Sequence, residues 1–317
     1  MFQKNLRTLV TGGTGFIGSH TVDRLISAGV EVTVLDNLHT GRLENIEQHK
    51  QNKKFRFVKG DIRNFRLVKQ LVKDTDAVLN LAAIVSVPLS IEKPLFVNDV
   101  NLKGALNLLK ACVDSNVKRF VQVSSAAVYG DAQTLPVRED FKPMPLSPYA
   151  VSKLAADNYA MAFNQIYGLE TVCLRYFNVF GPRQANNPYS GVITIFANAL
   201  LNNQQPKIFG DGKQTRDFVF VEDVVSANLL ALTKKEAVGE IFNVATGKAV
   251  TINKLLQILQ KITGKKNLKP VHAESRGGDI RHSYASIEKA RLLLGYKPVF
   301  SLEKGLKNLM QHTINSV

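Results

Sequence analysis

The sequence predicts an α/β protein with a doubly wound parallel sheet and a smaller C-terminal α/β domain. From residue 7 to about 175, short β-branched runs alternate with longer helical patterns, as in repeated βαβ units. A glycine cluster, TGGTGFIG at 11–18, follows the first of these runs and opens the first helical pattern. Rossmann sheets bind a dinucleotide at such a strand-to-helix turn.

Six strands are expected in the N-terminal part, at 8–11, 31–35, 55–59, 77–81, 120–124 and 171–174. Local signals set the helix boundaries between them. Gly29 is expected to end the first helix, and Pro94 to begin a long helix that continues to Cys112. Ser147 and Pro148 provide an N-cap and a first-turn proline for the next helix.

Past Arg175 the elements become shorter and loops richer in Gly, Pro and Asn separate them. Three later helices have readable boundaries, namely Thr251 with Gly264, Ser286 with Gly295, and Ser301. We therefore expect a cofactor domain at 1–177 and a mainly substrate-binding domain at 178–317, with segments at about 210–245 returning to the sheet.

Composition excludes several classes of protein. With 317 residues and 45% hydrophobic content, the chain can bury a substantial core, which rules out a disordered tail or a disulfide-stapled miniprotein. The 41 Lys and Arg against 26 Asp and Glu give a net charge of +15, which favours anionic partners. The basic residues are scattered, however, so we expect a surface role for most of them and no nucleic-acid partner.

The few cysteines and histidines exclude other classes of protein. The two cysteines, Cys112 and Cys173, lie in apolar stretches and predict neither disulfides nor a zinc site, which favours a reducing compartment. The histidines show no metal-ligand spacing, so no metal is expected. No secretory signal is visible, and AVLNLAAIVSVPLSI falls short of a spanning helix. We expect a cytoplasmic protein with no membrane partner.

The glycine cluster predicts a pyrophosphate site. Gly12 permits a tight turn, Gly15 lets the backbone approach the phosphates at the positive end of the helix, and Gly18 lets the helix pack on the strand. The spacing G-x-x-G-x-x-G is a variant of the commonest fingerprint, and an ordinary turn is the alternative. Asp36, about 20 residues further on, would accept hydrogen bonds from the ribose hydroxyls and so favours NAD over NADP.

A second acid is placed similarly. Asp61 follows the third strand, where it can meet the adenine side with Ile62 as an apolar wall; a helix N-cap is the alternative of equal weight.

Tyr149 and Lys153 are the candidate reacting groups. Their i, i+4 spacing places both side chains on one helix face, although such pairs are also common on ordinary helices. The ammonium would lower the pKa of the phenol towards neutrality and make Tyr149 a general base for an alcohol proton. Ser125, just past the fifth strand, could hydrogen-bond the same substrate oxygen.

At this point the chain resembles, over essentially its whole length, the extended short-chain dehydrogenases/reductases, specifically NAD-dependent nucleotide-sugar epimerases and dehydratases. The likeness is carried by Asp36 with Asn37, Asn101, and the segments TGGTGFIGSH (11–20), GDI (60–62), NLAA (80–83), SSAAVYG (124–130), YAVSK (149–153), RYFNVFGPRQ (175–184), RDFVFVEDV (216–224) and GGDIRHSYAS (277–286). These segments are most similar to the UDP-sugar 4-epimerase branch.

The resemblance implies site residues at matching positions. The catalytic residues would be Ser125, Tyr149 and Lys153. NAD would contact Gly12, Gly15, Phe16, Ile17, Gly18, Asp36, Asn37, Asp61, Ile62, Leu81, Ala82, Ala83, Asn101, Tyr149, Lys153 and Phe177. The nucleotide sugar would contact Ser86, Val87, Ser125, Ala126, Tyr149, Asn178, Val192, Arg216, Arg276, Asp279 and Ser283.

The reaction within the family is indicated by two alanines. Dehydratases and decarboxylases of this family carry an acid just after the catalytic hydroxyl, where this chain has Ala126 and Ala127. The resemblance therefore implies simple 4-epimerisation with NAD retained. Arg216 and Arg276 suit diphosphate anchors, with an ion pair between Arg216 and a nearby aspartate, Asp211 or Asp217, as the alternative.

Substrate and assembly are less determined. Ser283 matches a position where a bulky aromatic restricts similar enzymes to plain hexoses, so its small size favours UDP-N-acetylhexosamines as well as, or instead of, UDP-glucose and UDP-galactose. A UDP-glucuronate 4-epimerase and a non-catalytic NAD-binding regulator are the alternatives. A homodimer is expected through helices at about 94–114 and 148–167.

Overall fold

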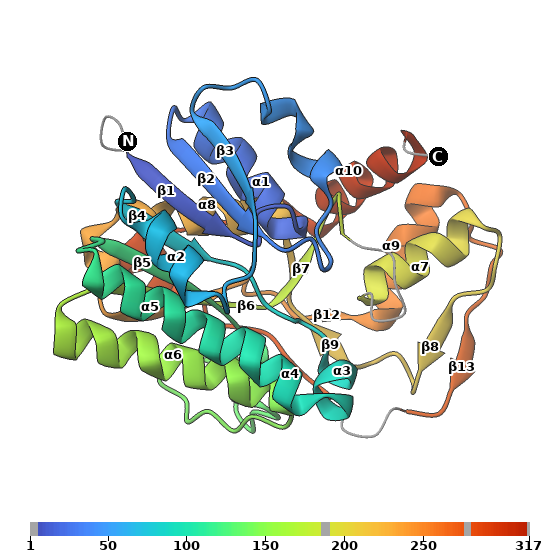
Figure 1. The fold of residues 1–317 in the computed structure, drawn as a ribbon. Helices are drawn as coiled ribbons and strands as arrows, with labels where there is room; N and C mark the ends of the chain where they lie inside the picture. The colour runs from blue at the N-terminus through green and yellow to red at the C-terminus, as the bar shows by residue number, and fades with distance from the viewer. Residues whose placement is uncertain (1–5, 185–190, 276–279, 316–317) are drawn as a thin grey trace.

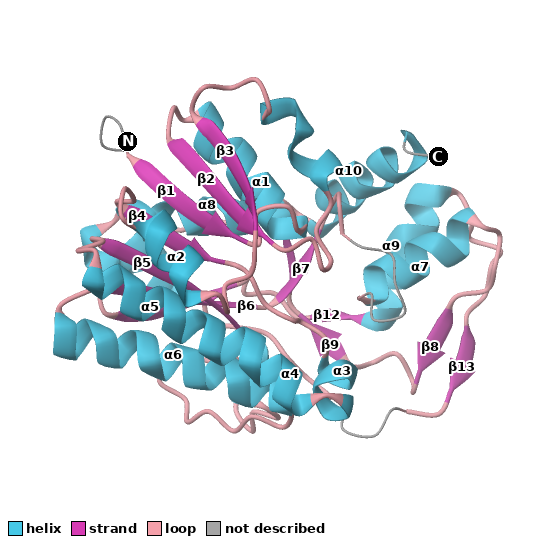
Figure 2. Ribbon diagram, viewed as in Figure 1, coloured by secondary structure: helices cyan, strands magenta, loops and turns pink. Residues whose placement is uncertain are grey.

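The computed structural model describes residues 6–184, 191–275 and 280–315. Its centre is a seven-stranded parallel sheet in the order β11-β6-β5-β4-β1-β2-β3 (Figures 1 and 2). The strands are β1 (Arg7–Thr11), β2 (Glu31–Asp36), β3 (Phe55–Lys59), β4 (Ala77–Asn80), β5 (Arg119–Ser125), β6 (Glu170–Tyr176) and β11 (Glu240–Val244). Strand order reverses between β1 and β4, and that switch point is where doubly wound sheets bind ligands.

Helices cover both faces of the sheet. On one face, α1 (Phe16–Ser27) packs beside α8 (Val221–Thr233). The other face carries α2 (Phe65–Val72), α5 (Gly104–Asp114) and α6 (Pro148–Tyr167). Successive strand residues point to opposite faces of the sheet, so Val10 packs in the core under α1 and Leu9 packs in the core under α5. Both residues are fully buried.

The C-terminal region is built of short pieces around a second core. Two-stranded pairs join β7 (Asn178–Phe180) to β10 (Phe218–Phe220), β9 (Thr215–Arg216) to β12 (Val250–Thr251), and β8 (Lys207–Phe209) to β13 (Val271–Ala273). Three helices, α7 (Val192–Leu201), α9 (Ile252–Thr263) and α10 (Leu302–Asn315), supply most of that core. Short 3₁₀ segments lie at η1 (Leu43–His49), η3 (Ala126–Tyr129) and η4 (Lys235–Ala237), and a π-helical segment lies at η5 (Ala290–Leu294).

All six predicted strands are present, with ends that differ by two residues or fewer. The caps at Ser147, Thr251 and Ser301 are also confirmed, since each hydroxyl accepts a hydrogen bond from a backbone N–H in the first turn. None of the helices in the described ranges is both long and apolar enough to cross a lipid bilayer.

Two helix predictions were wrong in detail. The long helix from Pro94 is not regular, because a π-helical turn, η2 (Asp99–Lys103), joins α4 (Pro94–Asn98) to α5. A separate short helix, α3 (Val87–Glu92), precedes α4. The π turn places the Asn101 side chain on the backbone of Ile84, a long-range contact that local sequence does not predict. After Ser286 the helix is also irregular, with η5 ending at Gly295 in the left-handed conformation.

Candidate active site

The glycine loop follows β1 at the carboxyl edge of the sheet, as predicted. Gly12 has a positive φ of 69°, and a Cβ there would lie 2.8 Å from the Ala82 nitrogen. A Cβ on Gly18 would lie 2.1 Å from the Gly12 carbonyl oxygen. These two approaches explain why glycine is needed at each position, and they bring the loop against the residues that follow β4.

The N-terminus of α1 fits a dinucleotide pyrophosphate. Gly15 is the N-cap residue, and neither a capping side chain nor an acid in the first turn occupies the backbone N–H groups. A Cβ on Gly15 would meet only the Gly12 carbonyl oxygen, at 3.2 Å, so the approach to this helix end is open. Phe16 and Ile17 begin the helix. The unsatisfied N–H groups and the helix dipole favour an anion here.

Asp36 ends β2 beside this loop and is buried. Its carboxylate accepts hydrogen bonds from the Thr14 nitrogen, at 3.1 Å, and from the Leu38 nitrogen, at 2.8 Å. Each carboxylate oxygen keeps a second acceptor site for a ribose hydroxyl. Asp36 is therefore placed both to fix the glycine loop and to meet the ribose.

Asp61 is held by a fork of hydrogen bonds from Arg63, at 3.0 and 2.9 Å, and by Asn37, whose amide donates at 2.9 Å. The guanidinium lowers the pKa of Asp61 to about 2, so the carboxylate is charged. The alternative of a helix cap is wrong for Asp61, because the cap of α2 is Asn64, which accepts from the Leu67 nitrogen.

The loop after β4 carries Leu81, Ala82 and Ala83. The Leu81 and Ala82 nitrogens donate to the backbone oxygen and the hydroxyl of Thr11, which holds this loop against β1. Asn101 is buried and uses its amide on both backbone groups of Ile84 and on the Ser152 hydroxyl. It thus ties the loop to α6 one residue before Lys153. Ile62 is buried against Gly104 at the start of α5.

The structure brings Ser125, Tyr149 and Lys153 to one place. Ser125 is the last residue of β5, and Tyr149 is the second residue of α6. Tyr149 and Lys153 are both buried, and the Lys153 ammonium donates a hydrogen bond to the Val123 carbonyl of β5. The end of one strand and the first turns of one helix therefore position all three groups.

Burial sets the proton affinities of this pair. It raises the pKa of Tyr149, and the hydrogen bond with Ser125 acts in the opposite direction. Burial also lowers the pKa of Lys153 to about 8, against the effect of Asp157. The prediction that Lys153 brings the pKa of Tyr149 towards neutrality is therefore not met by the side chains of the chain alone. Burial and the nearby Asp157 carboxylate both raise the pKa of the phenol, and the hydrogen bond with Ser125 is the contact that lowers it.

The candidate substrate residues lie on several elements. Ser86 caps α3 by accepting from the Leu89 nitrogen, and Val87 begins that helix. Ala126 begins η3 directly after Ser125. The remaining described candidates are Phe177, which is buried between β6 and β7, Asn178 on β7, Val192 at the start of α7, Arg216 on β9, and Ser283.

Arg216 and Ser283 are neighbours through the backbone. The Ser283 nitrogen donates to the Thr215 oxygen at 3.1 Å, beside the residue that carries the guanidinium. The two aspartates offered as its ion-pair partners have other contacts: Asp211 forms a fork with Arg281 at 2.7 and 2.9 Å, and buried Asp217 accepts from Thr246 and Gly247. Arg276 and Asp279 lie outside the described residues.

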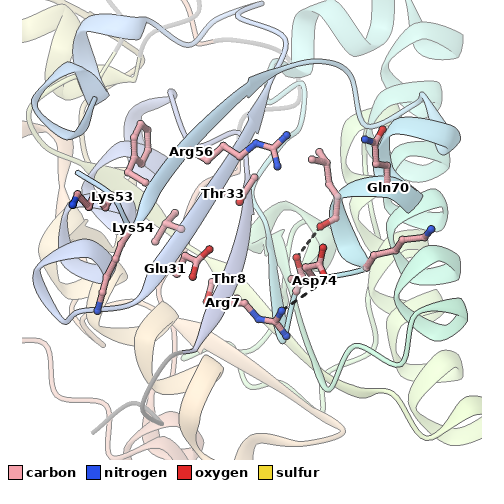
Figure 3. Close-up of a pocket in the computed structure, with 14 residues that line it drawn as sticks. Arg7, Thr8, Glu31, Thr33, Lys53, Lys54, Arg56, Gln70 and Asp74 are labelled. Atoms are coloured by element: carbon pink, nitrogen blue, oxygen red, sulfur yellow. Dashed lines mark hydrogen bonds and ion pairs between the residues drawn. The ribbon is translucent and has the colours of Figure 1, made fainter. Parts of the chain in front are cut away.

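A hollow opens at the amino edge of the sheet, opposite to the edge that carries the glycine loop (Figure 3). Its volume is about 460 Å³. It is lined by the amino halves of β1 to β3 and the end of α2, with charged side chains from Arg7, Glu31, Lys53, Lys54, Arg56, Lys73 and Asp74. Arg7 is paired with Asp76 at 3.0 Å. This edge is remote from Ser125 and Tyr149, so we do not assign the chemistry to it. In the described part of the chain, no cluster of metal-ligating side chains occurs.

Comparison with known proteins identifies the family. A family model described as the NAD dependent epimerase/dehydratase family matches residues 8–245. The chain belongs to this family. The resemblance noted in the sequence, the Rossmann fold and NAD as the cofactor are thereby confirmed.

Individual members of the family match almost the whole chain. The chain is 42% identical to a putative UDP-glucose 4-epimerase of Methanocaldococcus jannaschii, over 97% of this chain and 98% of that protein. A solved UDP-N-acetylglucosamine 4-epimerase from Methanobrevibacter ruminantium M1, in complex with UDP-N-acetylmuramic acid, is 38% identical with a TM-score of 0.95. The match covers 99% of this chain and 100% of that protein. A solved UDP-glucose 4-epimerase from Thermotoga maritima with UDP-glucose is 38% identical with a TM-score of 0.93. The match covers 98% of this chain and 99% of that protein.

Proposed function

We propose that the protein interconverts the C4 epimers of a UDP-hexose, with UDP-N-acetylglucosamine and UDP-N-acetylgalactosamine, or UDP-glucose and UDP-galactose, or both pairs, as substrates. The observation that carries the proposal is the convergence of Ser125, Tyr149 and Lys153 at the same carboxyl edge of the parallel sheet as the glycine loop. Family membership and the named relatives support the coarser statement that the protein is an NAD-dependent UDP-sugar 4-epimerase, an isomerase.

The residues of the chain divide the work as follows. When bound, NAD would supply reversible hydride transfer at C4, so the net redox change would be zero. Tyr149 removes the proton of the C4 hydroxyl and gives it back, and Ser125 hydrogen-bonds the same oxygen. Lys153, as a cation, favours the phenolate of Tyr149. Arg216 and Arg276 hold the diphosphate while the sugar turns.

Alanines after the catalytic hydroxyl support epimerisation over elimination. Ala126 and Ala127 form the start of η3, and their side chains have no acidic or basic group that could transfer a proton. A dehydratase would need an additional acid and base near the reacting carbons. The same feature does not separate hexoses from uronic acids, so a UDP-glucuronate 4-epimerase remains the second candidate, favoured by the net charge of +15.

A panel of substrates tests the proposal. The purified protein, with catalytic NAD only, would be incubated separately with UDP-N-acetylglucosamine, UDP-glucose and UDP-glucuronate, and the products resolved by NMR. We expect the C4 epimer of the N-acetylated sugar, the plain hexose or both, without accumulation of NADH. Conversion of UDP-glucuronate alone would favour the second candidate. Failure to convert any of the three, with NAD bound, would favour a non-catalytic NAD-binding protein.

Ser283 should influence which sugar fits. Its small side chain lies next to the strand that carries Arg216, and replacing it with tyrosine would fill space that an N-acetyl group needs. For Ser283→Tyr we expect loss of turnover with UDP-N-acetylhexosamines and retention with UDP-galactose, measured as kcat/KM for each sugar. Equal losses for both sugars would contradict this role, and Ser286→Tyr, three residues further on, is the control.

We also propose a homodimer formed through α4, α5 and α6. Apolar side chains are exposed on this side of the molecule, including Ile91 on α3, Leu95 on α4, and Val151 and Ile166 on α6. Leu95 is 85% exposed. Helices α3 and α4 both pack against α6, so these side chains belong to neighbouring elements (Figure 1). Two copies that pair such a surface would bury it from water.

Sedimentation tests the dimer. The Leu95→Glu, Val151→Glu double variant places two carboxylates in the proposed interface, and we expect it to sediment as a monomer while the unchanged protein sediments as a dimer. Leu292→Glu, an exposed leucine on η5, is the control and should leave the dimer intact. A monomeric unchanged protein would contradict the proposal.

We propose the cytoplasm as the compartment, in keeping with two buried free cysteines.

A further inference from the structure

The third residue on the reacting face of α6 is an aspartate that the proposed mechanism does not use. Tyr149, Lys153 and Asp157 follow one another at intervals of four residues, so their side chains leave the helix on one face, a turn apart. Asp157 has no exposed surface. A carboxylate is costly to bury unless it is paired, so the position of Asp157 inside the protein needs a physical explanation.

Asp157 joins the two elements that carry the reacting groups. One of its oxygens, Oδ2, accepts hydrogen bonds from the Ser124 hydroxyl at 2.9 Å and from Arg175 Nε at 3.1 Å. Ser124 and Arg175 are register partners on the neighbouring strands β5 and β6. Ser124 directly precedes Ser125, and Asp157 lies one turn after Lys153. The carboxylate therefore links the end of β5 to the first turns of α6.

Arg175 is itself fixed on its other side. Its guanidinium lies over the ring of Tyr129, 4.8 Å from the centroid, and the Tyr129 hydroxyl donates to Asn243 at 2.8 Å. Arg175 is only 2% exposed. Burial raises the pKa of Asp157, and the guanidinium of Arg175, which does not lose its proton in proteins, acts in the opposite direction and favours the carboxylate. The cluster thus presents two cations, Arg175 and Lys153, to one buried carboxylate.

Several titratable groups face this cluster. They are Tyr149 and Lys153 on α6, Cys173 and Arg175 on β6, Tyr129 on η3, and Glu139 from the segment after η3. Burial raises the pKa of Cys173 well above its ordinary value, so the thiol is neutral. Glu139 is bound to the Asn243 nitrogen at 2.8 Å. Asp157 is therefore the carboxylate of this cluster that lies on the same helix face as Lys153.

We propose that Asp157 is a positioning residue for the reaction, which supplies the buried negative charge that keeps the Lys153 ammonium protonated and aligned with Tyr149. Arg175 and Ser124 hold the carboxylate in place for this role. The proposal rests on the proposed function of Tyr149 and Lys153 and deepens it. The effect of Asp157 on Lys153 is in the required direction, since the carboxylate raises the pKa of Lys153 against the effect of burial.

Two substitutions should shift the activity in opposite directions along the pH axis. Asp157→Asn keeps the shape and removes the charge, which leaves Lys153 facing the Arg175 cation. Lys153 then loses its proton at lower pH, and the alkaline fall of kcat should move down by about one pH unit or more. Arg175→Gln keeps a hydrogen-bond donor and removes a cation beside Asp157. In the alkaline range Asp157 has already lost its proton, so the last proton of the Asp157 and Lys153 pair should leave at higher pH and the alkaline fall should move up.

The experiment measures kcat for the NAD-loaded enzyme at saturating UDP-sugar across the alkaline range, together with the melting temperature. Asp223→Asn is the matched control, because Asp223 on α8 is also a buried aspartate, and its carboxylate accepts hydrogen bonds from the Val299 and Phe300 nitrogens before α10. It should lower the melting temperature and leave the pH profile in place. Asp157→Glu restores the charge and should return the profile towards that of the unchanged protein.

Opposite shifts for Asp157→Asn and Arg175→Gln would support the proposal, because a merely structural role predicts loss of stability without a shift. Profiles that coincide with the unchanged protein, in whichever of the two variants folds, would overturn it. Tyr149→Phe separates this failure from that of the proposed function. If Tyr149→Phe is inactive and the profiles do not shift, only the role of Asp157 is wrong; if Tyr149→Phe is fully active, the proposed function itself is wrong.

Discussion

Tyr149→Phe should reduce turnover by about a hundredfold or more while NAD stays bound. The substitution keeps the ring in its buried place at the start of α6 and removes the hydroxyl to which the proposed mechanism assigns the proton transfer. Phenylalanine has no proton to exchange, so the C4 hydroxyl loses its proposed proton acceptor. The measurement is kcat with UDP-sugar at saturation, together with the NAD content of the purified variant.

Tyr167→Phe is the matched control for this variant. Tyr167 is the last residue of the same helix, is 54% exposed and packs its ring on Phe163. Its loss should leave both turnover and NAD content unchanged. Turnover by Tyr149→Phe close to that of the unchanged protein would show that another group moves the proton, and would remove Tyr149 from the mechanism.

Gly18→Ala should nearly abolish cofactor binding. The added methyl group would lie 2.1 Å from the Gly12 carbonyl oxygen and 2.8 Å from Gly13 Cα, both of them backbone atoms that cannot rotate aside. The glycine loop must therefore shift away from the end of α1. A displacement of about 1 Å at such a site costs on the order of a hundredfold in rate. We expect the purified variant to carry little NAD and to regain only part of its activity in excess NAD.

Gly264→Ala controls for the general effect of adding a methyl group. Gly264 ends α9 with φ of 71°, and its Cβ would meet nothing within 4 Å. Alanine in that left-handed conformation costs about 1–2 kcal/mol, so stability should fall while NAD content is kept. Wild-type NAD content in Gly18→Ala would mean that the cofactor does not depend on this close approach.

Local signals explain which parts of the fold could be predicted. The strands from β1 to β6 alternate with capped helices, and the sheet edge follows from their order, so Ser125, Tyr149 and Lys153 could be placed together before the structure was known. The regular helix expected after Pro94 failed because a tertiary contact, Asn101 with Ile84, selects a π turn there.

The buried cluster behind the site was the larger omission. The spacing of Tyr149, Lys153 and Asp157 was visible in the sequence, but the partnership of Asp157 with Arg175 depends on the pairing of β5 with β6 and on α6 lying across both strands. The proton affinity of Tyr149 in the chain alone could not be predicted for the same reason. Burial is a property of the folded chain, and burial together with the Asp157 carboxylate raises the pKa of Tyr149.

The fate of the hydrogen at C4 tests the central claim most directly. A UDP-sugar substrate that carries deuterium at C4 would be converted in ordinary water, and the deuterium content of the epimer at C4 measured by NMR or mass spectrometry. Transient oxidation at C4 with return of the same hydride predicts an epimer that keeps its deuterium, with no NADH released. An epimer that has exchanged its C4 deuterium for hydrogen from water would contradict the account.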